Sequence, residues 1–205
     1  GSWGSGGTVD FLEKAGCWGV GGVRSVGGVW PEAKAGGARG ARALPKPGKS
    51  PDSVYDLISF EGRKNYDARD LLATIVDADS LDEYKADYGK TLVTAYARIN
   101  GQPVGIVANQ RVQVRTKKEG IQMGGVIYSD SADKAARFVM DCNQTSLPII
   151  FFQDVTGFMV GRDAEQSGII RSGAKLVNAV RSSVVPNIQI VVDGYFGAVN
   201  CAICG

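Results

Sequence analysis

The 205-residue sequence contains no histidine. A Ser-His-Asp triad, a Cys-His pair and a His-ligated zinc site are therefore excluded within this chain. If the chain takes part in proton transfer, the proton has to be handled by other side chains, by a partner subunit or by the reactants themselves.

Cysteine is also scarce, with four residues at Cys17, Cys142, Cys201 and Cys204. These are too few and too scattered for a disulfide framework, so the sequence predicts a reducing location, the cytoplasm or a mitochondrial matrix. The Cys201-x-x-Cys204 spacing fits a redox or metal pair, but small packing cysteines are the preferred interpretation and no metal site is expected. No apolar run is long enough to span a membrane.

Neither positive nor negative charge predominates in the chain as a whole, since the formal net charge is only +2. The first fifty residues carry 7 Lys and Arg against 3 Asp and Glu, and they hold 14 of the 28 glycines. They show neither a strand period nor a helix period, so residues 1–50 are predicted to be a disordered, linker-like or non-native stretch. The remainder is slightly acidic, and no nucleic-acid partner is expected.

Residues 51–205 have the pattern of an α/β domain. Two apolar strands are expected at Ile149–Val155 and Ile188–Val192, joined by one long helix, which predicts neighbouring parallel strands buried on both faces. The elements expected are two helical stretches within 67–89, a β-hairpin over 91–109 with its turn at Asn100-Gly101, a polar loop over 111–125, and helices over 131–145 and 163–183.

The candidate functional residues follow the two apolar strands. In open α/β sheets, ligands bind beyond the carboxyl ends of the strands. The segments at these ends are 156–158, Thr-Gly-Phe, and 196–199, Phe-Gly-Ala-Val, and each precedes an expected helix. Backbone N–H groups at a helix start can stabilise an oxyanion, but the same glycines also occur in ordinary turns, so spacing alone leaves both interpretations open.

A run of motifs resembles a known family. The segments DVTGFMVGRDAEQSGIIRSGAKLVNAV and VVPNIQIVVDGYFGAVNCAICG, together with YDARDLLATIVD, YGKTLVTAYARINGQPVGIVANQ and SADKAARFVMDCNQ, are similar in sequence and order to the carboxyltransferase (beta-type) subunit of biotin-dependent acyl-CoA carboxylases. The resemblance covers about residues 51–205 and is strongest to the methylcrotonyl-CoA carboxylase and glutaconyl-CoA decarboxylase branch.

The resemblance implies a crotonase-like (ClpP/crotonase) ββα superhelix, of which this chain would be a C-terminal half, incomplete at its end. The active site would form with the N-terminal half of another subunit, which binds the acyl-CoA, within a homo-oligomer. The implied partners are a biotin carboxyl carrier and a biotin carboxylase subunit. The implied cofactor is biotin on the carrier, which would itself supply the base, so that no histidine would be needed.

The resemblance also implies roles for individual residues. The backbone amides of Ala198 and Val199 would form the biotin-side oxyanion hole, with Gly197 permitting the turn. The residues that would contact biotin are Thr156, Gly157, Phe158, Gly168 and Phe196.

Three functions stay open at this point. The chain could be a component that carboxylates an acyl-CoA, a glutaconyl-CoA decarboxylase alpha-type subunit that works in the reverse direction, or an inactive fragment that retains only the fold. The last is supported by departures from the branch's usual loop at Asp193, Tyr195, Val199 and Cys201.

Among the four departures in this loop, Val199 leads to a specific prediction about the rate of carboxyl transfer. A β-branched residue is stiff and rarely adopts a positive φ, so valine at a family glycine position is expected to turn its amide away or to block the biotin ring. Loss of one oxyanion donor costs ~3–4 kcal/mol, or about 10²–10³ in rate. In a chain completed with its missing segments, Val199→Gly should recover much of that loss in transfer from carboxybiotin. Equal rates with valine and glycine would show that Val199 is tolerated.

Overall fold

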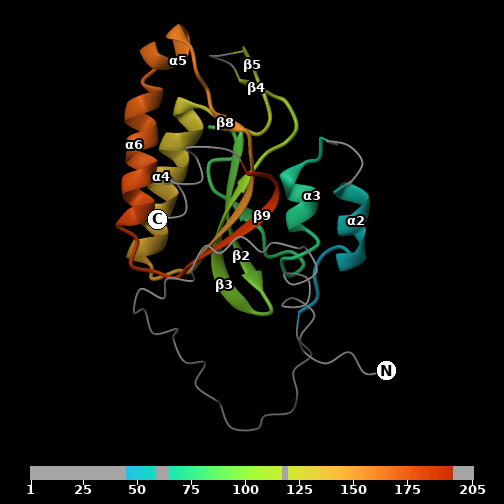
Figure 1. Cartoon of the computed structure of the whole chain (residues 1–205). Coiled ribbons are helices and arrows are strands. Elements are labelled where there is room, and N and C mark those ends of the chain that lie inside the picture. The colour runs from blue at the N-terminus through green and yellow to red at the C-terminus, as the bar shows by residue number, and fades with distance from the viewer. Residues whose placement is uncertain (1–44, 59–64, 117–119, 196–205) are drawn as a thin grey trace.

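A computed structural model describes residues 45–58, 65–116 and 120–195 (Figure 1). The expected site residues Phe196, Gly197, Ala198 and Val199 lie outside these ranges, as does nearly all of the Gly-rich segment. Residues 45–50 join the fold, since the Lys49 amide donates to the Ala73 carbonyl.

The described residues form a central sheet with helices on both faces. The helices are η1 (Pro51–Ser53), α2 (Val54–Leu57), α3 (Ala68–Leu72), α4 (Ser129–Gln144), α5 (Arg162–Gln166) and α6 (Ile169–Arg181). The strands are β1 (Asp82–Glu83), β2 (Leu92–Ile99), β3 (Gln102–Asn109), β4 (Val114–Thr116), β5 (Gly120–Gln122), β6 (Val126–Ile127), β7 (Ile149–Val155), β8 (Gly157–Phe158) and β9 (Asn187–Tyr195).

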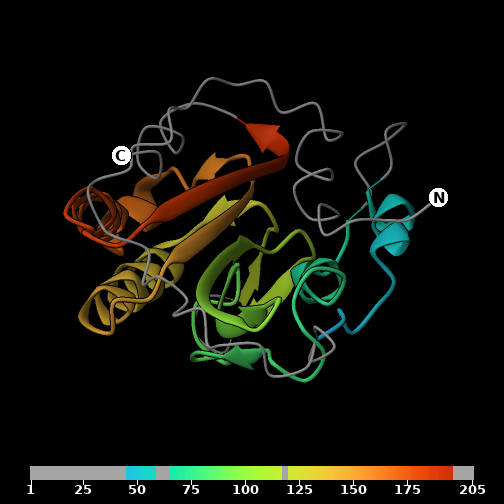
Figure 2. The ribbon, with the colours of Figure 1, turned by 90° about the horizontal axis from the view of Figure 1, so that it is seen from below.

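The main sheet has five strands in the order β1-β2-β3-β7-β9. The first three are antiparallel neighbours, whereas β7 runs parallel to both β3 and β9. The expectation that Ile149–Val155 and Ile188–Val192 are adjacent and parallel is therefore confirmed. Seen from below, α4 and α6 cover one face of the sheet and α2 and α3 lie on the other (Figure 2).

Strand β7 is buried along its whole length because both of its faces are covered. Phe151 packs into the cluster beneath α4 and α6, while Phe152 packs into the cluster beneath α3. Successive side chains of a strand point to opposite faces. The unbroken apolar run IIFF thus follows from a strand that serves two cores, as expected for a parallel sheet covered on both sides.

The hairpin between β2 and β3 has the expected two-residue turn. Asn100 and Gly101 both have positive φ, 53° and 80°, which is the conformation that a tight hairpin of this hand requires. The Asp77 carboxylate accepts hydrogen bonds from both of their amides, at 2.8 and 2.7 Å. A buried acid from outside the hairpin therefore stabilises the turn.

Helix α4 confirms the expected helix over 131–145 and approaches β3 closely. A Cβ on Gly105 would lie 2.6 Å from the Cys142 sulfur, so glycine lets the helix sit on the strand at this point. Burial raises the pKa of the Cys142 thiol to about 12. Cys142 is thus a protonated packing residue rather than a nucleophile.

The second helical stretch expected within 67–89 is wrong. After α3 the chain runs through turns, with positive φ at Asp79, Lys85 and Gly89, and forms only the short strand β1. Tyr84 packs against Tyr96 of β2 and Phe138 of α4. Packing and strand pairing outweigh the helical pattern of this segment.

Two other expected elements differ in detail. The helix over 163–183 is broken into α5 and α6 at Gly168, which has φ 87° and caps the second helix in the left-handed region. The N-cap of α5 is Gly161. The polar loop over 111–125 contains the antiparallel pair β4 and β5.

A buried lysine fastens the turn that precedes β2 to α4. Lys134 is 1% exposed, and its ammonium group donates to the carbonyl oxygens of Tyr88 and Lys85 at 2.8 and 3.3 Å. Gly89 in the same turn lies against the backbone of Ser131. Burial lowers the pKa of Lys134 to about 8, because the charged form loses its hydration.

We expect Lys134 to make stability depend on pH. Between pH 8 and 10.5 the unfolded chain binds more protons at this residue than the folded chain does, so folding stability should rise with pH across that window, by up to about 3 kcal/mol. Urea unfolding should show this rise for the native protein relative to Lys134→Met. Lys175→Met, which removes an exposed lysine from α6, is the control. Parallel pH curves for the native protein and Lys134→Met would contradict the expectation.

Candidate functional site

The candidate site lies where β7 leaves the main sheet. Thr156 is exposed, and the next two residues form β8, which pairs in parallel with β6 through Gly157 opposite Val126 and Phe158 opposite Ile127. The expected glycine-flanked loop is thus a short strand. The Thr156 amide donates to the Gly125 carbonyl at 2.7 Å and the Met159 amide to the Ile127 carbonyl at 2.8 Å.

The Phe158 ring turns toward α6. A Cβ on Gly173 would lie 3.4 Å from the ring, so the helix presents bare backbone to the ring at this position. By contrast, a Cβ on Gly157 would meet nothing within 4 Å. A ligand or partner can therefore approach the Gly157 backbone from the open side.

An apolar groove runs from β8 along α6. Its volume is about 480 Å³. Val160 and Ile170 on its rim are 80% and 75% exposed, which is unusual for large aliphatic side chains. The groove is lined by Phe158, Met159, Val160, Ile169, Ile170, Gly173, Ala174 and Val177, with Glu165 and Arg181 as its charged members.

The small residues of α6 lie on two sides of the helix, one facing the groove and the other facing α4. Gly173 and Ala174 line the groove, whereas Ser172 is buried against α4, with its hydroxyl 3.0 Å from the Ser129 hydroxyl. Gly168 caps α6 but is not among the groove's lining residues. Of the residues expected to contact biotin, the structure brings Thr156, Gly157 and Phe158 together.

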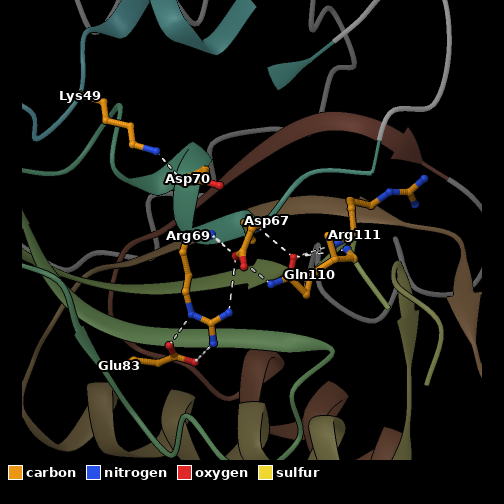
Figure 3. A network of polar contacts seen from close by, with 9 residues as sticks. Lys49, Asp67, Arg69, Asp70, Glu83, Gln110 and Arg111 are labelled. Carbon is orange, nitrogen blue, oxygen red and sulfur yellow. Dashed lines mark hydrogen bonds and ion pairs between the residues drawn. The ribbon is translucent and has the colours of Figure 1, made fainter. Parts of the chain in front are cut away.

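Beneath this edge, a polar network ties β3 to α3 (Figure 3). Gln110 accepts hydrogen bonds from the amides of Ala68 and Arg111, both at 3.0 Å, and donates to the Asp67 carboxylate at 2.9 Å. Asp67 caps α3 by accepting from the Arg69 amide. The end of β3 is thereby held to α3, which lies on the face of the sheet away from α4 and α6 (Figure 2).

The charge on Asp67 is stabilised by this network. Partial burial alone would raise the pKa of the carboxyl group, but hydrogen bonds from Gln110 and from Arg69 hold the pKa below its usual value of 3.8. The Arg69 guanidinium in turn donates two hydrogen bonds of 2.8 Å to the Glu83 carboxylate. Asp67 therefore stays ionised and acts as a structural cap rather than as a proton donor.

A nearly buried ion pair lies directly below Thr156. The Arg111 side chain is 11% exposed and the Asp154 side chain 2%, and their Nε and Oδ2 atoms are 3.4 Å apart. The Tyr66 hydroxyl donates to the same carboxylate oxygen at 2.8 Å. A Cβ on Gly124 would fall on the Arg111 carbonyl group, so this position requires glycine.

The sequence placed Arg111 in a solvated polar loop, which is wrong because its side chain is folded inward against Asp154, and it did not single out Asp154 or Tyr66. An acidic residue inside an otherwise apolar strand was the available signal, since a buried carboxylate needs a partner. The partners could not be named from the sequence, because Tyr66 lies 88 residues before Asp154.

Comparison with known proteins identifies the family. The family model "Carboxyl transferase domain" matches residues 6–205. This chain belongs to the carboxyl transferase domain family. The match begins well before residue 51 and so extends the resemblance seen in the sequence.

Curated relatives agree with this assignment. The beta1 subunit of the biotin-dependent 3-methylcrotonyl-coenzyme A carboxylase of Mycobacterium tuberculosis is 43% identical over 152 residues, 74% of this chain and 26% of the relative. The mitochondrial methylcrotonoyl-CoA carboxylase beta chain of Arabidopsis thaliana is 43% identical over 154 residues, 75% of this chain and 24% of the relative. The chain thus spans about a quarter of the length of these relatives.

Solved structures show the same crotonase-like fold. The beta subunit of P. aeruginosa geranyl-CoA carboxylase matches 81% of this chain and 30% of its own, with a TM-score of 0.69 and 31% identity. The transcarboxylase 12S hexamer, solved with methylmalonyl-coenzyme A and methylmalonic acid bound, matches 80% of this chain and 30% of its own, with a TM-score of 0.68 and 37% identity. No helix in the described ranges is long and apolar enough to cross a membrane.

The two site glycines provide a matched test. Gly124→Ala should lower the free energy of unfolding by about 1–3 kcal/mol, because the new methyl group meets backbone that cannot move aside. Gly157→Ala meets open space and should change stability by no more than about 0.5 kcal/mol. Urea unfolding midpoints of the two variants decide the matter, and equal midpoints would contradict the described packing of Arg111 against Gly124.

Proposed function

We propose that this chain is part of a carboxyltransferase component that moves a carboxyl group between carboxybiotin and an acyl-CoA, and that the edge formed by β8 and α6 is its biotin side. The groove from Phe158 to Val177 carries this proposal. Of the residues that the family resemblance assigns to biotin, Phe158 lines this groove, and Thr156 and Gly157 directly precede it in the chain. The groove offers a surface that a compact bicyclic ring could cover.

The groove's chemistry fits biotin. The fused rings of biotin are compact, with apolar ring carbons and a thioether beside a polar ureido group. Phe158 and the bare backbone at Gly173 offer an apolar wall to such a ring, while the open Gly157 backbone allows close approach. Thr156, which is exposed and immediately precedes β8, offers a polar hydroxyl group beside Gly157.

The roles of the chain's own residues follow from this placement. Phe158, Gly173 and Ala174 would position the ring and exclude water, and Thr156 would face its polar side. Carboxybiotin, when bound, would supply the carboxyl group. The backbone amide of Ala198 would stabilise developing negative charge, in line with the absence of histidine from the sequence, and the second donor position, Val199, is expected to be impaired by its β-branched side chain.

The acyl-CoA would be held elsewhere. Because the chain spans about a quarter of its relatives, we propose that the N-terminal half of another subunit completes the site, in a homo-oligomer served by a biotin carboxyl carrier and a biotin carboxylase subunit. The names of the relatives favour a branched enoyl-CoA such as 3-methylcrotonyl-CoA as substrate. A cytoplasmic or mitochondrial-matrix location is part of the same proposal.

Binding of free biotin tests the site on this chain alone. Amide resonances of Gly157, Phe158 and Ala174 should shift on titration with biotin and return to their free positions when biotin is removed. Lipoic acid, which has a similar acyl chain but no ureido ring, is the matched control. Equal shifts with both compounds, or none with either, would contradict a biotin site at this groove.

Transfer of carboxyl groups tests the function. With radiolabelled carboxybiotin and 3-methylcrotonyl-CoA, the chain alone should form no carboxylated acyl-CoA, whereas addition of the N-terminal half of a relative should allow transfer. Transfer by the chain without a second subunit would refute the need for the other half. No transfer in either case, with biotin binding intact, would favour a fragment that retains only the fold.

A further inference from the structure

Arg111 occupies an unusual place at the end of β3. It follows the last paired residues of that strand, and its side chain is folded inward until only 11% is exposed. Its Nε lies 3.4 Å from an Asp154 carboxylate oxygen that Tyr66 also contacts. Asp154 belongs to β7, so one guanidinium connects the ends of two neighbouring parallel strands.

The same guanidinium reaches the candidate site. Its Nη1 atom lies 3.5 Å from the Thr156 hydroxyl oxygen, a long hydrogen bond. It also packs against the backbone of Gly125, where φ is 74° and any side chain would collide with it. Gly125 in turn accepts the Thr156 amide at 2.7 Å. Arg111 therefore contacts Thr156 directly and also through the backbone segment that holds it.

In the hydrogen bond between Arg111 and Thr156, the donor and the acceptor are determined by their chemistry. A guanidinium carries five N–H donors and no acceptor, so the Thr156 oxygen can only accept from it. The hydroxyl has one proton of its own, and no acceptor for that proton lies in the described ranges of the chain. Thr156 is exposed and immediately precedes Gly157 and Phe158 of β8, so its proton remains available to an oxygen of a molecule bound at this edge.

We propose that Arg111 is a positioning residue that holds Thr156 in one rotamer, with its hydroxyl proton directed to a carbonyl or carboxylate oxygen of the ligand at the β8 edge. This proposal rests on the proposed function for the identity of the ligand, a ureido ring. The placement of Thr156 itself does not depend on that identity.

A purely structural role for the ion pair predicts something different. If Arg111 only neutralises buried Asp154, then removing both charges together should restore the native state of everything around them, since replacement of a buried ion pair by neutral groups is often harmless. If Arg111 positions Thr156, the loss of the guanidinium should loosen Thr156 even when stability is restored.

The first experiment separates these two roles without any ligand. In the double variant Arg111→Met with Asp154→Asn, the asparagine keeps an acceptor for Tyr66 and no charge is left buried. Three-bond couplings to the Thr156 methyl carbon report its χ1 rotamer. We expect one rotamer in the native chain and averaged couplings in the double variant, with amide exchange at Thr156 faster by about tenfold or more.

Arg115→Met, which changes an exposed arginine on the neighbouring strand β4, is the matched control and should leave the Thr156 couplings unchanged. Urea unfolding identifies how far the double variant is destabilised as a whole. Native couplings and native exchange at Thr156 in the double variant would overturn the proposal. The single variant Arg111→Lys should restore part of the rotamer order, because an ammonium can still donate to Thr156.

The second experiment tests the hydroxyl proton, with biotin as the probe. Thr156→Val keeps the shape and removes the hydroxyl group, and we expect it to weaken biotin binding by about fivefold to tenfold. Thr156→Ser keeps the hydroxyl and should stay within about twofold of the native chain. If Thr156→Val and Thr156→Ser weakened biotin binding equally, the proposed role of the hydroxyl proton would be overturned. Failure of the native chain to bind biotin would contradict the proposed function, and the χ1 comparison would still decide the role of Arg111.

Discussion

The double-sided burial of β7 is the constraint on which the rest of the structure depends. This strand pairs in parallel with β3 on one side and β9 on the other, and every one of its residues is buried. A strand in this position must satisfy two cores at once, so its register cannot slip by one residue without exchanging Phe151 and Phe152 between them. The place where β7 ends is therefore fixed to within a residue.

That fixed end is what makes a site possible there. Asp154 remains inside the sheet while Thr156, two residues later, is already exposed. The chain then pairs briefly as β8 with β6 and turns into α5 and α6, so that Phe158 meets the bare backbone of Gly173. A rigid strand thus delivers a polar group, an open glycine and an aromatic ring to one edge, which is the kind of support that a binding site on a scaffold needs.

Buried and partly buried polar groups support this edge from below. Gln110 and Asp67 tie the end of β3 to α3, and Arg111 and Tyr66 converge on Asp154. Gln110, Asp154 and Tyr66 are buried and would be costly if left without a partner, whereas Asp67 is partly exposed. These groups lie together at the carboxyl ends of β3 and β7. Because breaking their contacts is unfavourable, the backbone next to Thr156 is expected to be rigid.

Much of the architecture could be predicted from the sequence because periodicity reports which faces of an element are covered. The β2–β3 hairpin, α4 and the parallel pair β7 and β9 were predicted in this way and are present. The helical pattern before Gly89 failed, because pairing with β2 and the packing of Tyr84 outweigh weak local preference. The break of the helix at Gly168 was not predicted either, since a single glycine inside a periodic pattern does not reveal whether its φ is positive.

The sequence by itself determined the family and the order along the chain of the hairpin strands β2 and β3, helix α4 and the parallel strands β7 and β9, because these depend on motifs and on the spacing of residues within single elements. Only the tertiary structure decided that Phe158 faces Gly173 and that Arg111 lies between Asp154 and Thr156. Those contacts join residues from different elements. Their distances are set by sheet register and by the path of the connecting loops, which no periodicity along the chain encodes.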